Sequence, residues 1–368
     1  MKEYKAYIFD LDGTLLDTLE DLADAVNHSM RENGFPERTL EEVRSFVGDG
    51  MRLLVKRAAP EGTGDGLLDK AFGDFRDHYS VHYMDKTKPY PGIEPMLRIL
   101  KAQGKRLCVI SNKADFAVKL LMDQFFPGIF ETVLGERDGI RRKPAPDSLL
   151  AVMEELGLPK EECVYIGDSD TDIETARNAG TDSISVSWGF RTEDFLKDRG
   201  AMKIALSPWD IPETRARDPF MAEAVKEAFA GISQKHGGPF GCVIVKDGKI
   251  VGRGHNMVLE NTDSTAHGEI TAIRNAEKAL GTYDLSGCEL YTTGEPCPMC
   301  LYAILWAKVE KVYYGCTIED NAELGFRDKE FDEMGGGRES FKDFLVCLDR
   351  EACLELFRVY SKLRHDRH

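Results

Sequence analysis

The chain has 368 residues, more than one hydrophobic core usually serves, so we expect two domains. Apolar residues make up 42% and charged residues 30%, which excludes a disordered chain, and no apolar run approaches the roughly 18 residues that a membrane span requires. The formal net charge of −16 opposes non-specific binding to nucleic acid, because such binding depends on Lys and Arg releasing counterions.

The first half of the chain carries short apolar runs that end in a polar residue, at 4–10 (YKAYIFD), 106–112 (RLCVISN) and 163–168 (CVYIGD). Helix-like stretches separate these runs, which is typical of a parallel sheet with crossover helices. Residues 15–88 mix charged and apolar residues at helical spacing and predict an inserted helical subdomain. A further strand is expected at 183–189 (SISVSWG).

A linker is expected at 207–219 (SPWDIPETRARDP), which carries three Pro and no periodicity. A second α/β unit then follows, with helices at 221–235, at 267–280 and from about 296, a hairpin turn at Asp247-Gly248, and strands CELYTT and VEKVYYGC. We therefore expect one domain at 1–210, with its core at 1–14 and 89–210 and a cap at 15–88, and another at 219–368.

Polar side chains stand at the ends of the predicted strands in the first domain. Asp10 and Asp12, in DLDGT, follow the first strand, where open α/β sheets place their ligands. Two carboxylates at this spacing bind a hard cation, and a carboxylate is a nucleophile for phosphorus. Each motif alone has an ordinary reading as a turn or strand end, but together they predict a phosphate cradle, completed by Ser111, Asn112, Lys143, Asp168 and Asp172.

In this order, the motifs of residues 1–210 resemble the haloacid dehalogenase superfamily. Within it, NAG at 178–180 and SVSWGFR at 185–191 are most similar to the phosphoglycolate phosphatases. The resemblance implies a magnesium-dependent phosphatase with a Rossmann-like sheet and a helical cap. Asp10 would be the nucleophile that forms an aspartyl-phosphate, and Asp12 would protonate the leaving alcohol and then activate water.

The same resemblance implies a set of supporting residues. Asp168 would hold magnesium with the Asp10 carboxylate and the Asp12 carbonyl, and Asp172 would support the metal site. The phosphoryl oxygens would be neutralised by Ser111, Asn112 and Lys143. The cap loop 48–51 (GDGM) would face the substrate. The substrate itself stays open, because related enzymes hydrolyse nucleotides, pyrophosphate and sugar phosphates.

In the second half of the chain, the motifs HGE and PCPMC each begin a predicted helix. Cys297 and Cys300 share one face of a helix start, whose positive end favours thiolates. With His267 they make three zinc ligands and leave the fourth position for water, which Glu269 can reach without ligating the metal. This is the H-x-E…P-C-x-x-C signature of zinc deaminases. A structural zinc knuckle and an ordinary pair of buried Cys are the alternatives.

Residues 219–330 resemble the cytidine deaminase superfamily, most closely its bacterial guanine deaminases, through GGPFGCVIVKDG, STAHGE, EPCPMC and NAELGFRD. The resemblance implies an α/β/α fold in which Asn256 hydrogen-bonds the base and Asp320 meets an amino or ring N–H group. Asn256 also has an ordinary explanation as a turn residue. Deaminases of this type form dimers, so we expect a homodimer through this domain.

Other substrates of the deaminase domain stay open. GHNM and HGE resemble fungal cytosine deaminase, Gly294 stands where a Cys is common, and the tail SKLRHDRH has no counterpart of the aromatic tail of guanine deaminases. Cytosine or a nucleoside is therefore an alternative to guanine. Adenosine deamination on transfer RNA belongs to the same superfamily, but the acidic balance and the lack of a basic, aromatic-rich stretch disfavour it.

The sequence thus predicts a bifunctional hydrolase of nucleobase or nucleotide salvage, with zinc and magnesium as cofactors and small molecules as substrates. A shared pathway rests only on the fusion, and a catalytically idle binding or assembly domain is the alternative. Nine Cys without a regular framework favour a reduced cytoplasmic chain. The N-terminus enters a strand directly, so we expect no signal peptide.

Overall fold

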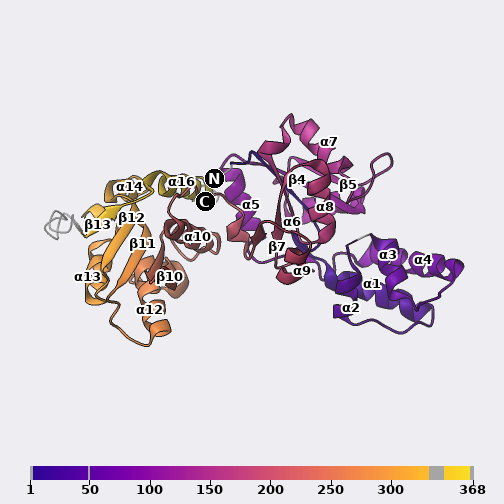
Figure 1. Ribbon diagram of the computed structural model, residues 1–368, viewed down its shortest axis with the longest axis horizontal. Helices are drawn as coiled ribbons and strands as arrows, with labels where there is room; N and C mark the ends of the chain where they lie inside the picture. The colour runs from indigo at the N-terminus through magenta and orange to yellow at the C-terminus, as the bar shows by residue number, and fades with distance from the viewer. Residues whose placement is uncertain (1–2, 49, 331–343, 365–368) are drawn as a thin grey trace. The chain divides into compact units, whose positions relative to one another are not determined.

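The structure is a computed structural model that describes residues 3–48, 50–330 and 344–364. Its contacts divide the chain into two compact units, one ending at Ile211 and the other beginning at Pro212 (Figure 1). Across the described residues, no helix combines the length and the apolar character needed to cross a membrane.

The first unit is built on a six-stranded sheet in the order β5-β4-β1-β6-β7-β8, in which every neighbouring pair is parallel. Its strands are β1 (Ala6–Phe9), β4 (Arg106–Ala114), β5 (Thr132–Glu136), β6 (Cys163–Gly167), β7 (Asp182–Val186) and β8 (Ile204–Ala205). Because side chains alternate along a strand, Tyr7 and Phe9 of β1 join one apolar core, while Ala6 and Ile8 join the other. The predicted Rossmann-like sheet is confirmed.

Helices cover both faces of this sheet. The first core includes residues of α5 (Ile93–Ala102) and α6 (Asp115–Phe125), and the second those of α7 (Asp147–Leu156) and α8 (Asp170–Ala179). The remaining elements are η1 (Lys160–Glu162), α9 (Glu193–Asp198) and η2 (Pro208–Asp210). The first part of the predicted linker packs on this unit, because Ile211 joins the first core and Trp209 lies against Gly92.

A helical cap is inserted after β1. It consists of α1 (Leu19–Glu32), α2 (Leu40–Phe46), α3 (Met51–Ala58) and α4 (Asp65–His82), and a short antiparallel pair leads into and out of it, β2 (Leu16–Asp17) with β3 (Lys88–Pro89). The four helices enclose an apolar cluster that includes Val26, Met30 and Phe75, and Phe190 from outside the cap joins it. The predicted inserted helical cap is therefore confirmed.

The second unit is a five-stranded sheet in the order β10-β9-β11-β12-β13. Its strands are β9 (Gly241–Lys246), β10 (Lys249–His255), β11 (Cys288–Gly294), β12 (Lys311–Cys316) and β13 (Leu345–Cys347); β9 pairs antiparallel with β10 and β11, and the other pairs are parallel. Asp247 and Gly248 have φ of 50° and 71°, as a tight hairpin turn requires, so this prediction is confirmed.

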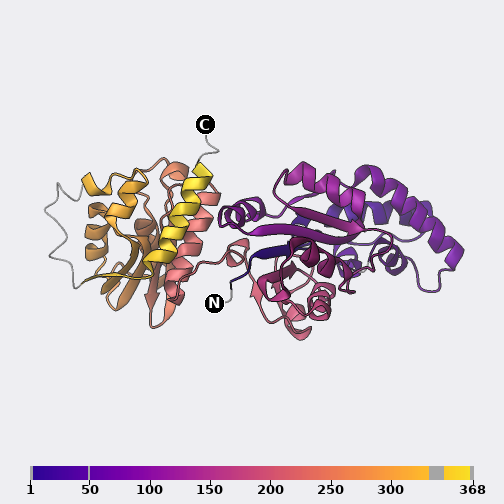
Figure 2. The same cartoon turned by 90° about the horizontal axis from the view of Figure 1, so that it is seen from above.

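Helices also lie on both faces of the second sheet. They are α10 (Pro219–Ser233), α11 (Val258–Asn261), α12 (Gly268–Leu280), α13 (Pro298–Trp306), α14 (Ile318–Glu323) and α16 (Arg350–Arg364). Cys242 and Ile244 of β9 join an apolar core with α12 and α13. The neighbouring Gly241 faces α10, which lies beside α16 (Figure 2). This second α/β/α unit was also predicted.

Candidate active sites

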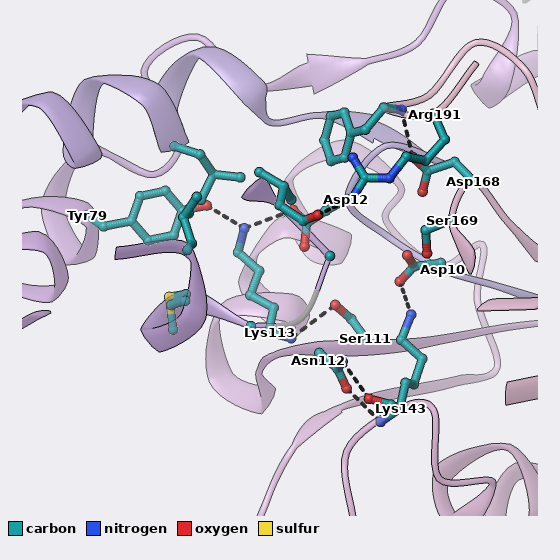
Figure 3. A pocket seen from close by; sticks show the side chains of 17 residues that line it. Asp10, Asp12, Tyr79, Ser111, Asn112, Lys113, Lys143, Asp168, Ser169 and Arg191 are labelled. Atoms are coloured by element: carbon teal, nitrogen blue, oxygen red, sulfur yellow. Dashed lines mark hydrogen bonds and ion pairs between the residues drawn. The ribbon is translucent and has the colours of Figure 1, made fainter. Parts of the chain in front are cut away.

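The first site lies where strands of the parallel sheet end (Figure 3). Asp10 follows β1, Asp168 follows β6, and Ser111 lies near the end of β4. Carboxylate oxygens of Asp10, Asp168 and Asp172 all lie within 4.8 Å of one another. The fold therefore brings together the carboxylates that the sequence motifs singled out, although they come from separate parts of the chain.

Two glycines make room for the carboxylate of Asp168. A Cβ atom on Gly13 would lie 2.3 Å from Oδ2 of Asp168, and one on Gly189 would lie 2.3 Å from its Cβ. The amide of Phe190 donates a hydrogen bond to Oδ2 at 2.7 Å. Gly13 of DLDGT is thus required for two reasons: a side chain there would collide with Asp168, and its φ of 81° is one that other residues rarely adopt.

Lys143 lies between two carboxylates in the buried part of this site. Its Nζ atom is 2.7 Å from Oδ1 of Asp10, 2.8 Å from Oδ1 of Asp172 and 3.0 Å from the Tyr165 hydroxyl. The other oxygen of Asp172 accepts hydrogen bonds from the hydroxyl and the amide of Ser169, at 2.6 and 3.1 Å. Because both of its oxygens have protein partners, Asp172 positions Lys143, and its predicted support of a metal site stays a prediction.

The site is short of positive charge. Burial raises the pKa of Asp10 well above its usual range, and repulsion from Asp172 adds to the effect. The pKa of Asp168 is raised as well, first by burial and then by Asp172. In the described chain, Lys143 forms ion pairs with Asp10 and Asp172, and Asp168 has no ion pair with a basic side chain. Closely spaced carboxylate oxygens with uncompensated charge fit a magnesium ion.

A second lysine, which we did not predict, joins the cap to the core. Nζ of Lys113 lies 3.1 Å from Oδ1 of Asp12 and 2.6 Å from the hydroxyl of Tyr79, a residue of α4 (Figure 3). Lys113 follows directly on the Ser111-Asn112 pair, so its place at a strand end was a usable signal. Tyr79 had no such signal, because it comes from the cap.

The two polar residues before Lys113 differ in what they offer a ligand. Asn112 donates from Nδ2 to the carbonyl of Lys143 at 3.2 Å and accepts from the Lys143 amide at 2.9 Å. Both ends of its side chain thus hold the Lys143 loop, and a phosphate contact would cost those bonds. Ser111 accepts from the Lys113 amide at 3.1 Å, and its hydroxyl proton has no acceptor among the described residues.

The second site lies where α12 and α13 begin, with His267 as the N-cap of one and Cys297 as the N-cap of the other. Nδ1 of His267 is 3.6 Å from the Sγ atoms of both Cys297 and Cys300. Tetrahedral zinc, with Zn–N of about 2.1 Å and Zn–S of about 2.3 Å, separates N from S by about 3.6 Å. The three side chains therefore fit a zinc ion.

The surroundings of these side chains suit a catalytic zinc site. Hydrogen bonds, first from Cys300 and then from His267, lower the pKa of Cys297 to about 4, while the bond with Cys297 and burial raise the pKa of Cys300. Glu269 is 4% exposed and accepts from the Thr292 hydroxyl at 3.3 Å. Among the described residues no further Cys or His joins the cluster, which gives a four-ligand structural knuckle no support.

Asn256 and Asp320 differ in whether their side chains have hydrogen-bonding atoms available to a bound base. Oδ1 of Asn256 accepts from the Val258 amide at 3.1 Å, and its Nδ2 has no partner in the described chain. Asp320 forms a two-point ion pair with Arg350, and its Oδ2 also accepts from the Thr317 amide at 2.8 Å. A base contact would have to displace Arg350, so we do not carry the prediction for Asp320 further.

Asp328 lies near the zinc-binding side chains, although we did not predict it. The pKa of His267 is raised to about 9, first by its hydrogen bond with Cys297 and in smaller part by the charges of Glu269 and Asp328. Oδ2 of Asp328 accepts from Nδ2 of the buried Asn321 at 3.2 Å. Asp328 is the last residue of the NAELGFRD motif, eight residues after Asp320, and this position in the motif could have indicated that it lies near the site.

Comparison with known proteins assigns each unit. Residues 7–186 match the haloacid dehalogenase-like hydrolases, and residues 214–316 match the zinc-binding region of cytidine and deoxycytidylate deaminases. Phosphoglycolate phosphatase of Pseudomonas putida is 36% identical over 189 residues, 50% of this chain and 69% of that protein. Guanine deaminase of Bacillus subtilis is 52% identical over 118 residues, 31% of this chain and 76% of that protein.

A solved structure supports the first of these matches. It is a Lactobacillus delbrueckii subsp. bulgaricus protein assigned as a phosphoglycolate phosphatase. The TM-score is 0.55 and the sequence identity 38%, and the match covers 57% of this chain and 97% of the Lactobacillus chain. Fold and sites together define an α/β protein that joins two hydrolase classes in one chain. The chain belongs to the haloacid dehalogenase-like phosphatase family through its first unit, and its second unit carries the zinc-binding region of the cytidine and deoxycytidylate deaminase family.

Proposed function

We propose that the chain is a bifunctional hydrolase, which removes phosphate from a small phosphomonoester and converts guanine to xanthine with release of ammonia. One observation carries the proposal. Each unit combines a set of metal-donor atoms with a buried carboxylate suited to the chemistry, Asp10 in the first unit and Glu269 in the second. The sequence identity to the Bacillus subtilis guanine deaminase favours guanine as the substrate. Ammonia release from cytosine and from nucleosides should be measured beside that from guanine, and turnover of one of them in place of guanine would contradict this assignment.

In the phosphatase site, the carboxylate of Asp10 attacks phosphorus, so that an Asp10–O–P bond forms and the ester P–O bond breaks. Asp12 gives its proton to the leaving alcohol and later takes one from the water that hydrolyses the aspartyl-phosphate. Magnesium, held by Asp10 and Asp168, would offset the charge of the phosphoryl oxygens. Lys143 holds Asp10 in place through an ion pair, and Lys113 does the same for Asp12.

In the deaminase site, Glu269 takes a proton from the attacking water and delivers it to a ring nitrogen of the base. A second proton passes through Glu269 to the amino group, the C–N bond breaks, and ammonia leaves. Zinc, held by His267, Cys297 and Cys300, would supply Lewis-acid activation of the water. The Nδ2 group of Asn256 is free to donate to the base.

Removal of zinc is expected to separate the two activities. Dialysis against a zinc-selective chelator in excess magnesium should reduce ammonia release from guanine to the enzyme-free rate, because the zinc ligands have no role in the phosphatase site. Phosphate release should stay within about two-fold of the untreated rate, and added zinc should restore ammonia release. Parallel assays on one sample check this, and simultaneous loss of both activities would contradict it.

We further propose that the deaminase unit forms a homodimer through α13. Met299, Tyr302 and Trp306 lie on one face of this helix and are 36%, 57% and 83% exposed. Aromatic anchors in interfaces contribute roughly 2 kcal/mol or more each. Replacing Tyr302 and Trp306 together with Glu should therefore shift the protein from dimer to monomer in light scattering. Tyr283→Glu, an exposed aromatic outside α13, should stay dimeric, and a monomeric wild type refutes the proposal.

A further inference from the structure

Two histidines of the deaminase unit face each other next to Asn256. Nδ1 of His236, in the loop that follows α10, lies 2.9 Å from Nε2 of His255, the last residue of β10. The ring centroids are 5.2 Å apart and the ring planes are inclined by 24°, which is the geometry of an N–H···N bond close to both ring planes. Neither histidine belongs to the zinc-binding cluster, and the proposed deamination assigns them no step.

Glu227 of α10 decides which ring nitrogens carry protons. One of its carboxylate oxygens lies 3.4 Å from Nδ1 of His255, and the other lies 3.5 Å from Arg253, which also pairs with Glu223 at 2.8 Å. A carboxylate only accepts, so Nδ1 of His255 donates to it, and Nε2 of the neutral ring is left as an acceptor. Nδ1–H of His236 donates to this acceptor, so the bonds run from the loop through β10 to α10.

The loop that begins at His236 also contacts Asn256. A Cβ atom on Gly237 would lie 1.9 Å from Oδ1 of Asn256, so the loop backbone lies directly against this amide group. At the other end of the loop, the carbonyl of Phe240 accepts from the backbone amide of Asn256 at 2.9 Å. Asn256 itself follows His255 in the chain. The bond between the two histidines therefore joins the two segments that set the position of the Asn256 side chain.

We propose that His236 is a positioning residue for base recognition, because its hydrogen bond to His255 holds the loop 236–240 against Asn256. This inference rests on the proposed deaminase function. The loss of one intramolecular hydrogen bond changes an equilibrium by roughly three- to ten-fold. Since the pair lies outside the zinc-binding cluster, its loss should weaken binding of the base and leave the chemical step unchanged. The expected signature is a higher KM with an unchanged kcat.

Two substitutions of His236 test this role in the full-length, zinc-loaded enzyme. His236→Ala removes the donor, whereas His236→Asn keeps a side-chain N–H close to the position of Nδ1. At about pH 7.5, His236→Ala should raise KM for guanine roughly three- to ten-fold with kcat within about two-fold of wild type, and His236→Asn should keep the wild-type KM within about two-fold. An unchanged KM in folded His236→Ala, or an equal rise in both variants, overturns the inference. Absence of ammonia release by the wild type would instead refute the deaminase function itself.

The pH dependence of KM gives a second test. One added proton leaves the bond intact, because one ring keeps a bare nitrogen that accepts, but two imidazolium rings would present N–H to N–H. The pKa of His236 is lowered, first by burial and then by the charge of His255, while Glu260 of α11 opposes the effect.

The wild-type KM should therefore rise as the pH falls below the usual histidine pKa of about 6.5. His236→Asn should show a smaller rise, because its amide can turn and accept from a protonated His255. The zinc site is the same in both proteins, so its own titration cancels in the comparison. The same rise of KM with falling pH in both proteins contradicts the inference.

Discussion

Asp10→Asn is expected to lower phosphate release by more than about 10³-fold and to leave ammonia release from guanine at the wild-type rate. Asparagine has the shape of aspartate but lacks the nucleophilic carboxylate, so no aspartyl-phosphate can form. The two sites lie in separate compact units, which is why the deaminase should be unaffected. The measurement is kcat/KM for p-nitrophenyl phosphate and for guanine on the same preparation.

An acid-to-amide control separates this effect from a general loss of negative charge. Asp123 is exposed on α6, away from the lining of the phosphatase pocket, and Asp123→Asn should retain both activities. Asp10→Asn also removes the charge that pairs with Lys143, so thermal unfolding should be compared as well. If folded Asp10→Asn kept a tenth or more of the phosphatase rate, Asp10 would not be the nucleophile.

Glu269→Gln should lower ammonia release by about 10³- to 10⁴-fold, because glutamine cannot accept the proton of the attacking water. Zinc should stay bound at the wild-type level, since Glu269 lies outside the set of three side chains that fit the metal. Metal analysis and ammonia release on the same sample measure both quantities. Phosphate release should not change.

A substitution of one of the zinc ligands is expected to affect both zinc content and ammonia release. His267→Ala removes one of three donor atoms and should lose zinc together with ammonia release. Zinc loss in Glu269→Gln would show that this carboxylate is part of the ligand set. Deamination at the wild-type rate by the zinc-loaded Glu269→Gln variant would exclude it as the proton carrier.

The sequence could predict those parts of the two sites whose residues lie close together along the chain or at the ends of strands. A Cys at i and i+3 on a helix start needs only one helix to bring Cys297 and Cys300 together, and HGE fixes Glu269 relative to His267. Strand ends in a parallel sheet meet at one edge, so the strand pattern alone was enough to place Asp10 and Asp168 together.

The parts that could not be predicted depend on long-range packing. Tyr79 reaches Lys113 because the cap folds over the core, and nothing near Tyr79 in the sequence indicates this. The ion-pair partner of Asp320 is Arg350 of α16, which lies 30 residues further along the chain, so this pair was hidden from a motif-based interpretation. Asn112 similarly holds the Lys143 loop through contacts that only the folded chain supplies.

The most direct test of a bifunctional chain follows both products across one chromatographic peak. Phosphate release from p-nitrophenyl phosphate and ammonia release from guanine would be measured in every fraction of the zinc- and magnesium-loaded wild type. We predict that both activities follow the protein in a constant ratio, and that the Asp10→Asn/Glu269→Gln double variant has neither. Activities that separate between fractions, or that persist in the double variant, would contradict the account.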